Sequence, residues 1–154
     1  TTIDIVEGQR GISYERWFAP YFCGAKKVTL VDPYIRFDYQ IQNLMRFCDV
    51  LAPSSGHVEL DLRTSVESPA QEEELRAKFD ELQASLATNS VVFRYEIRPD
   101  LHDRWVETDT GWRVMLGRGL DIFQRPDGRF NLGFVDQAKR RCKGTTISYT
   151  RAAS

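Results

Sequence analysis

Residues 57–97 read HVELDLRTSVESPAQEEELRAKFDELQASLATNSVVFRYEI, and this stretch indicates the fold class because it predicts a strand, a helix and a second strand. Residues 57–63 alternate apolar and polar side chains, as in a strand with one buried face. Ser68 and Pro69 are typical of the start of a helix. The apolar stripe predicted for this helix consists of Leu75, Phe79, Leu82 and Leu86. Residues 91–97 then read as a buried strand.

The same alternation of strands and helices precedes this stretch. Residues 2–6 and 28–31 have the pattern of short strands. Ser13 caps a predicted helix that runs to Phe22, and its aromatic residues form one broad face made of Tyr14, Trp17, Phe18 and Tyr21. A further helix is predicted at 38–51, with an apolar stripe made of Ile41, Leu44, Met45, Cys48 and Leu51.

Beyond residue 97 the pattern changes to short segments separated by glycine and proline. Segments around Trp105 and at 112–116, 129–134 and 145–149 read as strands and hairpins. The predicted order is therefore β-α-β-α-β-α-β followed by a strand-rich tail. This order implies an α/β fold with a mixed β-sheet flanked by helices on both faces. We expect one domain over residues 1–154.

The composition is that of an ordinary globular protein, with 42% hydrophobic and 28% charged residues, which argues against a disordered chain. The sequence has no apolar run of the roughly 18 to 20 residues that a spanning helix needs, so any membrane contact would be peripheral. The three cysteines are widely spaced and have no histidine cluster beside them. They favour a reducing, cytoplasmic location, with no metal or cofactor. Because the chain begins at Thr1 without a methionine, we expect part of a longer protein.

Charge is distributed unevenly, although the net charge is only -1. Residues 1–110 carry 12 basic and 19 acidic side chains, a net charge of -7, whereas residues 111–154 carry 9 basic and 3 acidic ones, a net charge of +6. The basic excess favours an anionic partner, either membrane lipid or nucleic-acid phosphate. The alternative is that these cations are solvated or pair with the acidic helix upstream.

The segment His102–Asp109 reads His-x-Arg-x-x-x-x-Asp. It resembles the phospholipase D superfamily motif His-x-Lys-x-x-x-x-Asp, with arginine in place of lysine. In that superfamily the histidine attacks phosphorus, the lysine holds phosphate oxygens, and the aspartate orients or charge-balances a histidine. The resemblance assigns these roles to His102, Arg104 and Asp109, and each residue type suits its role chemically. The alternative is a simple turn at His102 and Asp103.

Other segments in the same order make the resemblance specific for one family. They are Val-Asp-Pro-Tyr-Ile-Arg at 31–36, Asn-Leu-Met-Arg-Phe-Cys at 43–48, Gly-Arg-Gly-Leu-Asp at 117–121 and Arg-Phe-Asn-Leu-Gly at 129–133. Together they resemble the phospholipase-D-like C-terminal domain of MIT-domain-containing proteins, the MIT_C family. The resemblance implies a phospholipase-D-like fold, a homodimer and, in eukaryotic members, binding to phosphoinositide-containing membranes during cell division. An ESCRT-III partner is not carried over from the resemblance, because the MIT domain that docks onto ESCRT-III tails is not in this sequence.

Two departures from the superfamily favour binding over hydrolysis. Catalysis there uses two such motifs, one for the nucleophile and one for the general acid, so a second copy would have to come from another subunit. Active enzymes also have Gly-Ser-x-Asn where this chain has Gly-Arg-Gly-Leu at 117–120. Arginine at 104 still holds phosphate through a bidentate fork, but it need not support the same transition state.

We therefore predict a non-catalytic domain that forms a homodimer, binds an anionic or phosphorylated ligand, and directs a larger parent protein to it. The predicted ligand-binding residues are His102, Arg104, Arg36, Arg118, Arg113, Lys139, Arg140, Arg141 and Lys143. Arg36 has an alternative role in a surface ion pair with Asp32 or Asp38. Trp105 and Trp112 are expected in the core or at the dimer interface.

Two other functions stay open at this point. The first is a metal-independent phosphodiesterase or nuclease, with His102, Arg104 and Asp109 as catalytic candidates and two copies of the motif across a homodimer. The second is a protein-interaction module that uses the aromatic face of residues 14–21.

Overall fold

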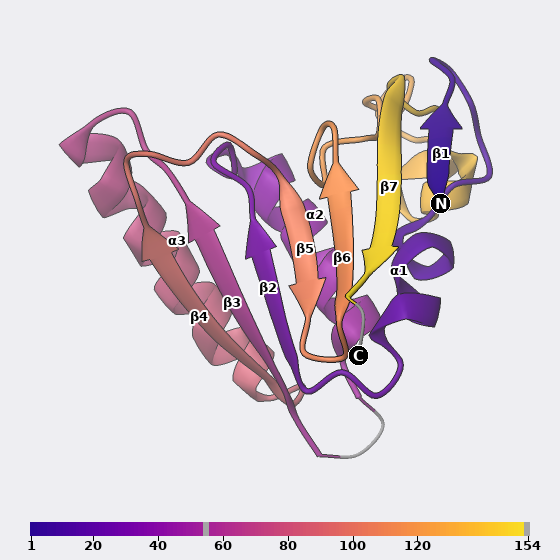
Figure 1. The fold of residues 1–154 in the computed structure, drawn as a ribbon. Coiled ribbons are helices and arrows are strands. Elements are labelled where there is room, and N and C mark those ends of the chain that lie inside the picture. The colour runs from indigo at the N-terminus through magenta and orange to yellow at the C-terminus, as the bar shows by residue number, and fades with distance from the viewer. Residues whose placement is uncertain (54–55, 153–154) are drawn as a thin grey trace.

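The computed structural model describes residues 1–53 and 56–152, which form a seven-stranded mixed sheet with helices (Figure 1). The strand order is β1-β7-β6-β5-β2-β3-β4. The strands are β1 (Thr2–Ile5), β2 (Lys27–Val31), β3 (Val58–Thr64), β4 (Val91–Ile97), β5 (Trp105–Thr108), β6 (Trp112–Leu116) and β7 (Thr145–Arg151). Strands β2, β3 and β4 run parallel, and the other neighbouring pairs run antiparallel. The predicted mixed α/β sheet is confirmed.

The helices are α1 (Tyr14–Phe22), α2 (Asp38–Leu51) and α3 (Pro69–Ala87). Two of the three helices, α1 and α3, begin where the sequence predicts caps. The Ser13 hydroxyl accepts from the backbone N–H of Arg16 at 3.2 Å, and the Ser68 hydroxyl accepts from that of Gln71 at 3.1 Å. The two 3-10 turns are η1 (Leu132–Phe134) and η2 (Gln137–Lys139). The strand predicted at 129–134 is therefore wrong, because that segment ends in η1.

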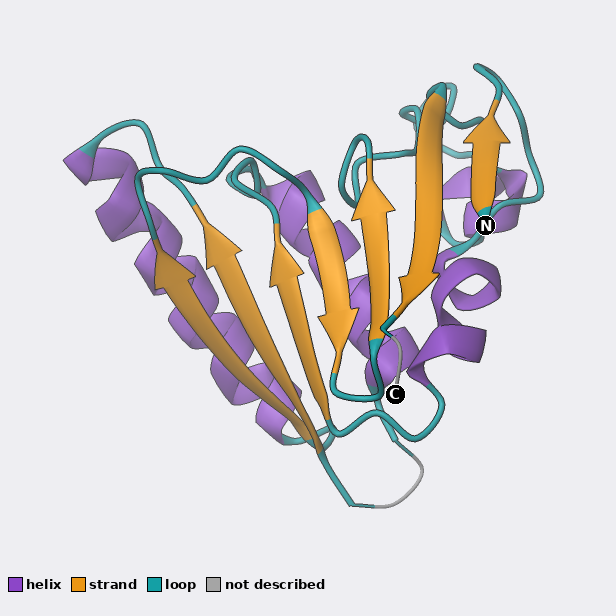
Figure 2. Cartoon of the chain, viewed as in Figure 1, coloured by secondary structure: helices purple, strands orange, loops and turns teal. Residues whose placement is uncertain are grey.

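All three helices pack against one face of the sheet, as Figure 2 shows. The two crossovers β2-α2-β3 and β3-α3-β4 join neighbouring parallel strands, and crossovers of one hand in one direction place both helices on the same side. Helix α1 joins them there, since the hydroxyl of Tyr149 in β7 donates to the Trp17 carbonyl at 3.0 Å. The sequence-based expectation of helices on both faces is corrected accordingly.

The core lies between these helices and the covered face of the sheet. Phe79 of α3 packs edge-on against Phe93 of β4, with ring centroids 5.7 Å apart. Phe18 of α1 packs edge-on against Phe47 of α2 at 5.2 Å. Tyr14, Trp17 and Phe18 are buried, so the aromatic face of α1 is internal and does not offer a partner surface. Of the stripe predicted for α2, Met45 is instead exposed.

The opposite face of the sheet carries no helix among the described residues. The register places alternate polar side chains on it, including Glu59, Asp61 and Arg63 of β3. Trp105 of β5 also lies on this open face, and the Arg113 guanidinium stacks over its ring at 4.5 Å. Trp105 was expected either in the core or at a dimer interface, and its place on the open face excludes the core.

One edge of the sheet gathers the segments that carry the motifs. Strands β2, β3 and β4 end at this edge, β5 begins there and β6 ends there (Figure 1). Residues 117–124 follow β6 directly, and the Tyr14 hydroxyl of α1 donates to the Leu120 carbonyl within this segment. We call this the carboxyl edge, because the parallel strands end there.

Candidate functional site

Asp32 is the buried acid of the carboxyl edge. It follows β2 directly, and its side chain is only 4% exposed. Its Oδ1 accepts from the backbone N–H of Tyr34 at 3.0 Å. Burial raises the pKa of this carboxyl to about 6, although the Tyr34 and Leu120 backbone hydrogen bonds and the charge of Arg104 act in the opposite direction. The edge therefore holds an acid that titrates near neutral pH.

Arg104 lies beside this acid and stacks on Tyr34. Its guanidinium carbon is 4.8 Å from the centre of the Tyr34 ring, within the range of a cation–π contact. Among the described residues Arg104 forms no salt bridge. The Asp32 carboxyl offsets part of its charge. Because no direct ion pair with the described residues holds its guanidinium, this group can still contact an incoming anion at the edge of the sheet.

Arg36 also contacts the ring of this tyrosine but is already paired. Its guanidinium carbon is 5.8 Å from the Tyr34 ring centre, and its Nη1 lies 2.7 Å from Oε1 of Glu67. The predicted ion pair with Asp32 or Asp38 is therefore wrong in its partner. Glu67 lies in the loop between β3 and α3. It becomes a neighbour of Arg36 because β3 pairs with β2, the strand that precedes Arg36. Because Glu67 already neutralises its charge, Arg36 acts mainly as a contact that holds the Tyr34 ring in place.

His102 lies in the loop between β4 and β5 and is exposed. It lines a shallow, open pocket of about 320 Å³ together with Arg104, Gly117, Thr146 and Ser148. Since the pocket opens between the start of β5 and the end of β6, it combines the histidine and arginine of the sequence motif. The structure thus brings together two of the three motif residues.

Asp109 is not in this pocket. It follows the far end of β5, where its Oδ1 accepts from the backbone N–H of Lys26 at 3.0 Å and its own N–H donates to the Lys27 carbonyl at 3.0 Å. His102 precedes β5 and Asp109 follows it, so the strand's length separates them within one chain. The resemblance predicts that Asp109 orients or charge-balances a histidine, and within one copy that histidine cannot be His102.

The other predicted cations divide between several places. Arg118 is exposed at the carboxyl edge, and its Nε donates to the Gly144 carbonyl at 3.0 Å. Arg113 lies on the open face over Trp105. Lys139 and Arg141 are exposed in the segment before β7. These side chains do not converge on a single point.

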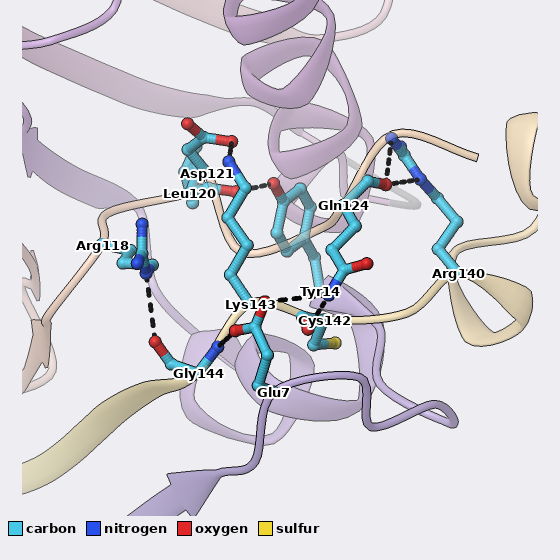
Figure 3. Close-up of polar contacts among 10 residues, drawn as sticks. All are labelled: Glu7, Tyr14, Arg118, Leu120, Asp121, Gln124, Arg140, Cys142, Lys143 and Gly144. Atoms are coloured by element: carbon cyan, nitrogen blue, oxygen red, sulfur yellow. Dashed lines mark hydrogen bonds and ion pairs between the residues drawn. The ribbon is translucent and has the colours of Figure 1, made fainter. Parts of the chain in front are cut away.

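Arg140 and Lys143 turn toward the protein instead (Figure 3). Arg140 donates from Nε and Nη2 to the Gln124 carbonyl, at 3.3 and 3.1 Å. Lys143 forms an ion pair with Asp121 at 2.9 Å. Both side chains line a cavity beside α2 that also contains Arg46, a residue that sequence reasoning did not select. Within residues 139–143, Lys139 and Arg141 therefore face solvent, whereas Arg140 and Lys143 line the cavity.

Sequence reasoning also missed Asp32 and Tyr34 as site residues. The available signal was their position, because polar residues that directly follow a buried parallel strand lie at the carboxyl edge of the sheet. Arg46 lies in the family segment at 43–48, but that segment was used only to recognise the family, since the apolar stripe of the helix gave no reason to select a site residue there.

The pKa of Asp32 predicts a specific pH dependence of stability. A carboxyl whose folded pKa is raised from 3.8 to about 6 binds its proton more tightly in the folded state, so its contribution to stability falls as pH rises from about 4 to 6. The loss amounts to at most about 3 kcal/mol. Asp32→Asn removes this titration, so its stability relative to the wild type should increase over that window. Urea unfolding at pH 4, 5 and 7 measures the difference.

The matched control for this experiment is Asp103→Asn, because Asp103 is exposed. The pH dependence of this variant is the baseline against which that of Asp32→Asn is compared. If the free energies of unfolding of Asp32→Asn and the wild type differ by the same amount at pH 4 and pH 7, the raised pKa of Asp32 is contradicted.

Comparison with known proteins is clear at the family level. The family described as a phospholipase D-like domain at the C-terminus of MIT matches residues 11–151. The chain belongs to this family. In the mouse, Mus musculus, MIT domain-containing protein 1 is 35% identical over 147 residues, which cover 94% of this chain and 59% of that protein. The chain thus spans 59% of the length of this family member.

The likeness to a solved structure is weaker. TrmBL2, an archaeal chromatin protein whose structure shows a novel mode of DNA binding, is 10% identical with a TM-score of 0.40. The match covers 97% of this chain and 45% of that one. A likeness at this level supports no conclusion about the family's ligand.

Two further observations concern the described residues of this family member. No helix within 1–53 and 56–152 combines the length and apolar character needed to cross a bilayer. In the same residues, no group of three or more His, Cys, Asp or Glu side chains is placed to hold a metal ion.

Proposed function

We propose that this phospholipase-D-like domain binds an anionic or phosphorylated surface without cleaving it. The observation that carries the proposal is the state of the motif at the carboxyl edge: His102 and Arg104 share a pocket, whereas Asp109 lies at the opposite end of β5. The cationic part of the motif is present at this edge, and the acidic part is elsewhere.

The binding chemistry follows from the two arginines of this edge. Arg104 forms no salt bridge with the described residues, and Arg118 uses its Nε for a carbonyl, which leaves the two terminal nitrogens of its guanidinium for a ligand. Guanidinium groups bind phosphate oxygens through parallel, charge-assisted hydrogen bonds. Exposed Lys139 and Arg141 would add attraction at longer range.

Turnover would require groups that one copy does not place at this edge. Phosphodiester cleavage by a histidine nucleophile needs a second group that protonates the leaving oxygen. His102 is the only histidine near the pocket among the described residues, and Asp109 cannot reach it from the other end of β5. We therefore favour binding as the function of the edge.

A homodimer that directs a longer protein completes the proposal. The open face of the sheet supports pairing, because it combines Trp105 with charges of both signs, such as Asp61 and Arg63, that could pair across a two-fold axis. A directing role is supported by the length of the mouse family member, of which this chain spans 59%. Sedimentation equilibrium of the purified chain measures its mass in solution, and the proposal expects the mass of a dimer.

The experiment on binding compares two double variants. We expect the wild type to bind phosphatidylcholine vesicles that contain phosphatidylserine, or DNA, more weakly at higher salt, since exposed cations release counterions. Arg104→Gln with Arg118→Gln should lower the affinity at least about tenfold, given roughly 1 kcal/mol per cation near an anionic surface. Vesicle co-sedimentation and fluorescence anisotropy with labelled DNA provide the two readouts.

The control removes two charges from the opposite edge of the sheet. Lys26→Gln with Lys27→Gln causes the same change in net charge and should lower the affinity about twofold or less. Equal losses in the two double variants would contradict the assignment to the carboxyl edge, and absence of salt-sensitive binding to both vesicles and DNA would contradict binding altogether. Diester hydrolysis that disappears in His102→Ala would overturn the non-catalytic part.

A further inference from the structure

A second cavity lies beside α2, away from the His102 pocket. Its volume is about 590 Å³, within the range of small-molecule sites. One wall comes from the first half of α2, and the other comes from residues 123–143. The lining residues are Tyr39, Gln42, Asn43, Arg46, Phe123, Arg125, Pro126, Phe134, Arg140 and Lys143.

Two guanidinium groups face this cavity close to each other. Burial lowers the pKa of Arg140, and the positive charge of Arg46 lowers it further, so the two charges repel each other. Each is held by a carbonyl oxygen: Arg46 Nη2 donates to Phe134 at 3.0 Å, and Arg140 donates to Gln124 (Figure 3). Neither forms a salt bridge with the described residues. An anion between them would relieve this repulsion.

The rest of the lining adds positive charge and no free acid. Arg125 lines the cavity and is exposed. Lys143 is neutralised by Asp121, whose carboxylate lies 2.9 Å from its Nζ. The lining itself contains no aspartate or glutamate. The charge of Asp121, just outside the lining, raises the pKa of Arg140 and offsets part of its charge. None of the three arginines forms a salt bridge with the described residues, so the excess of positive charge favours a ligand with more than one negative charge.

The cavity also has an apolar part that a bare ion would leave unfilled. Tyr39, Phe123 and Phe134 contribute aromatic surface, and the Arg140 guanidinium lies 5.5 Å from the Phe123 ring centre. The side chain of Asn43 is only 7% exposed, and Gln42 lies beside it, so two amides can orient a polar group. A ligand that fits this lining has an anionic end joined to an organic body.

We infer that this cavity binds a phosphomonoester, either of a small soluble molecule or of a lipid headgroup. A phosphomonoester has close to two negative charges at neutral pH, because its second pKa is near 6, whereas a phosphodiester has one. Two adjacent arginines match the dianion and its three terminal oxygens. The inference goes beyond the proposed function, because it places the phosphate at Arg46 and Arg140 and does not depend on Arg104 and Arg118.

The test compares monoesters with matched diesters at pH 7.5. Calorimetric titration uses adenosine 5′-monophosphate against its 3′,5′-cyclic diester, with inorganic phosphate as the minimal probe. Vesicle co-sedimentation uses phosphatidic acid against phosphatidylserine. We expect the monoester of at least one pair to bind about tenfold more tightly than its diester. The soluble pair and the vesicle pair distinguish a free metabolite from a lipid as the source.

The matched variants are Arg46→Gln, Arg140→Gln and, as the control, Arg141→Gln. Arg141 is exposed, adjacent in sequence to Arg140 and absent from the cavity lining, so its substitution changes the net charge equally. We expect about tenfold or greater loss of monoester binding in the first two variants and about twofold or less in the third. Because Arg140 also holds Gln124, thermal unfolding checks its fold, and Arg46→Gln provides an independent test.

The outcomes separate this inference from the proposed function. Equal losses in Arg46→Gln and Arg141→Gln, or equal affinity for monoester and diester in both pairs, would overturn the phosphomonoester site. If salt-sensitive binding to phosphatidylserine or DNA persists in that case, the carboxyl-edge proposal stands alone. Selective monoester binding without any binding to phosphatidylserine or DNA would support the phosphomonoester site in the cavity and overturn the proposal that the carboxyl edge binds anions.

Discussion

Gly119→Ala is expected to destabilise the fold by about 3 kcal/mol, more than a typical surface substitution. Gly119 has φ +62°, a left-handed conformation that costs a non-glycine residue about 1 to 2 kcal/mol. A Cβ atom there would also overlap Oδ2 of Asp32 and lie 2.9 Å from Cδ of Arg104. Because Asp32 is buried and hydrogen-bonded to the backbone, it cannot move away at low cost.

The matched control is Gly128→Ala, since Gly128 has φ +70° but no atom within 4 Å of the position that an alanine methyl group would take. It should cost only the conformational part, about 1 kcal/mol. Chemical denaturation of both variants measures the difference. Equal destabilisation of the two variants would contradict the close approach at Asp32. Displacement of Arg104 should also weaken anion binding in Gly119→Ala under folding conditions.

Phe18→Ala is expected to destabilise the protein by about 3 to 5 kcal/mol, through lost burial and the cavity left behind. Phe18 is 1% exposed and lies at the centre of an aromatic cluster. Its ring stacks on Phe22 at 5.4 Å and meets Phe47 edge-on at 5.2 Å. Since these rings join α1 to α2, their loss should also loosen the α2 wall of the cavity that contains Arg46.

Phe130→Ala provides the control, because this phenylalanine is 92% exposed and its removal should change stability by less than about 0.5 kcal/mol. Urea unfolding monitored by far-UV circular dichroism reports both variants. A cost below about 1 kcal/mol for Phe18→Ala would contradict the core position of the α1 aromatic face.

The sequence predicted most helices and strands well, because their signals are local. The helix predicted at 38–51 is α2 with the same bounds, and the strand predicted at 91–97 is β4. Ser13 and Ser68 cap α1 and α3 as predicted. The strand predicted at 129–134 was wrong because Asn131 starts a 3-10 turn there, its Oδ1 accepting from the backbone N–H of Gly133 at 2.8 Å. The family was also evident from the sequence, since its motifs occur in order along the chain.

The candidate site could be predicted only in part. The sequence places His102 and Arg104 together because they are two positions apart in one loop, and both line the same pocket. Asp109 was assigned to them because the motif is close in sequence, but a strand between the residues carries the aspartate to the opposite edge. The partner of Arg36 proved to be Glu67, 31 positions away, which no local pattern indicates.

Helix caps and side-chain periodicity depend on neighbours a few residues apart, so the amino-acid order by itself determined where α1, α2 and α3 begin and which sides they bury. The tertiary structure alone decided that all three helices cover one face, since that depends on the lateral order of the strands. It also brought Arg46 of α2 beside Arg140, 94 positions later, because packing of the last segment against α2 joins residues that share no local signal. The basic excess of residues 111–154 was visible in the sequence, but only the fold shows that Arg140 lies beside Arg46 while Lys139 and Arg141 face solvent.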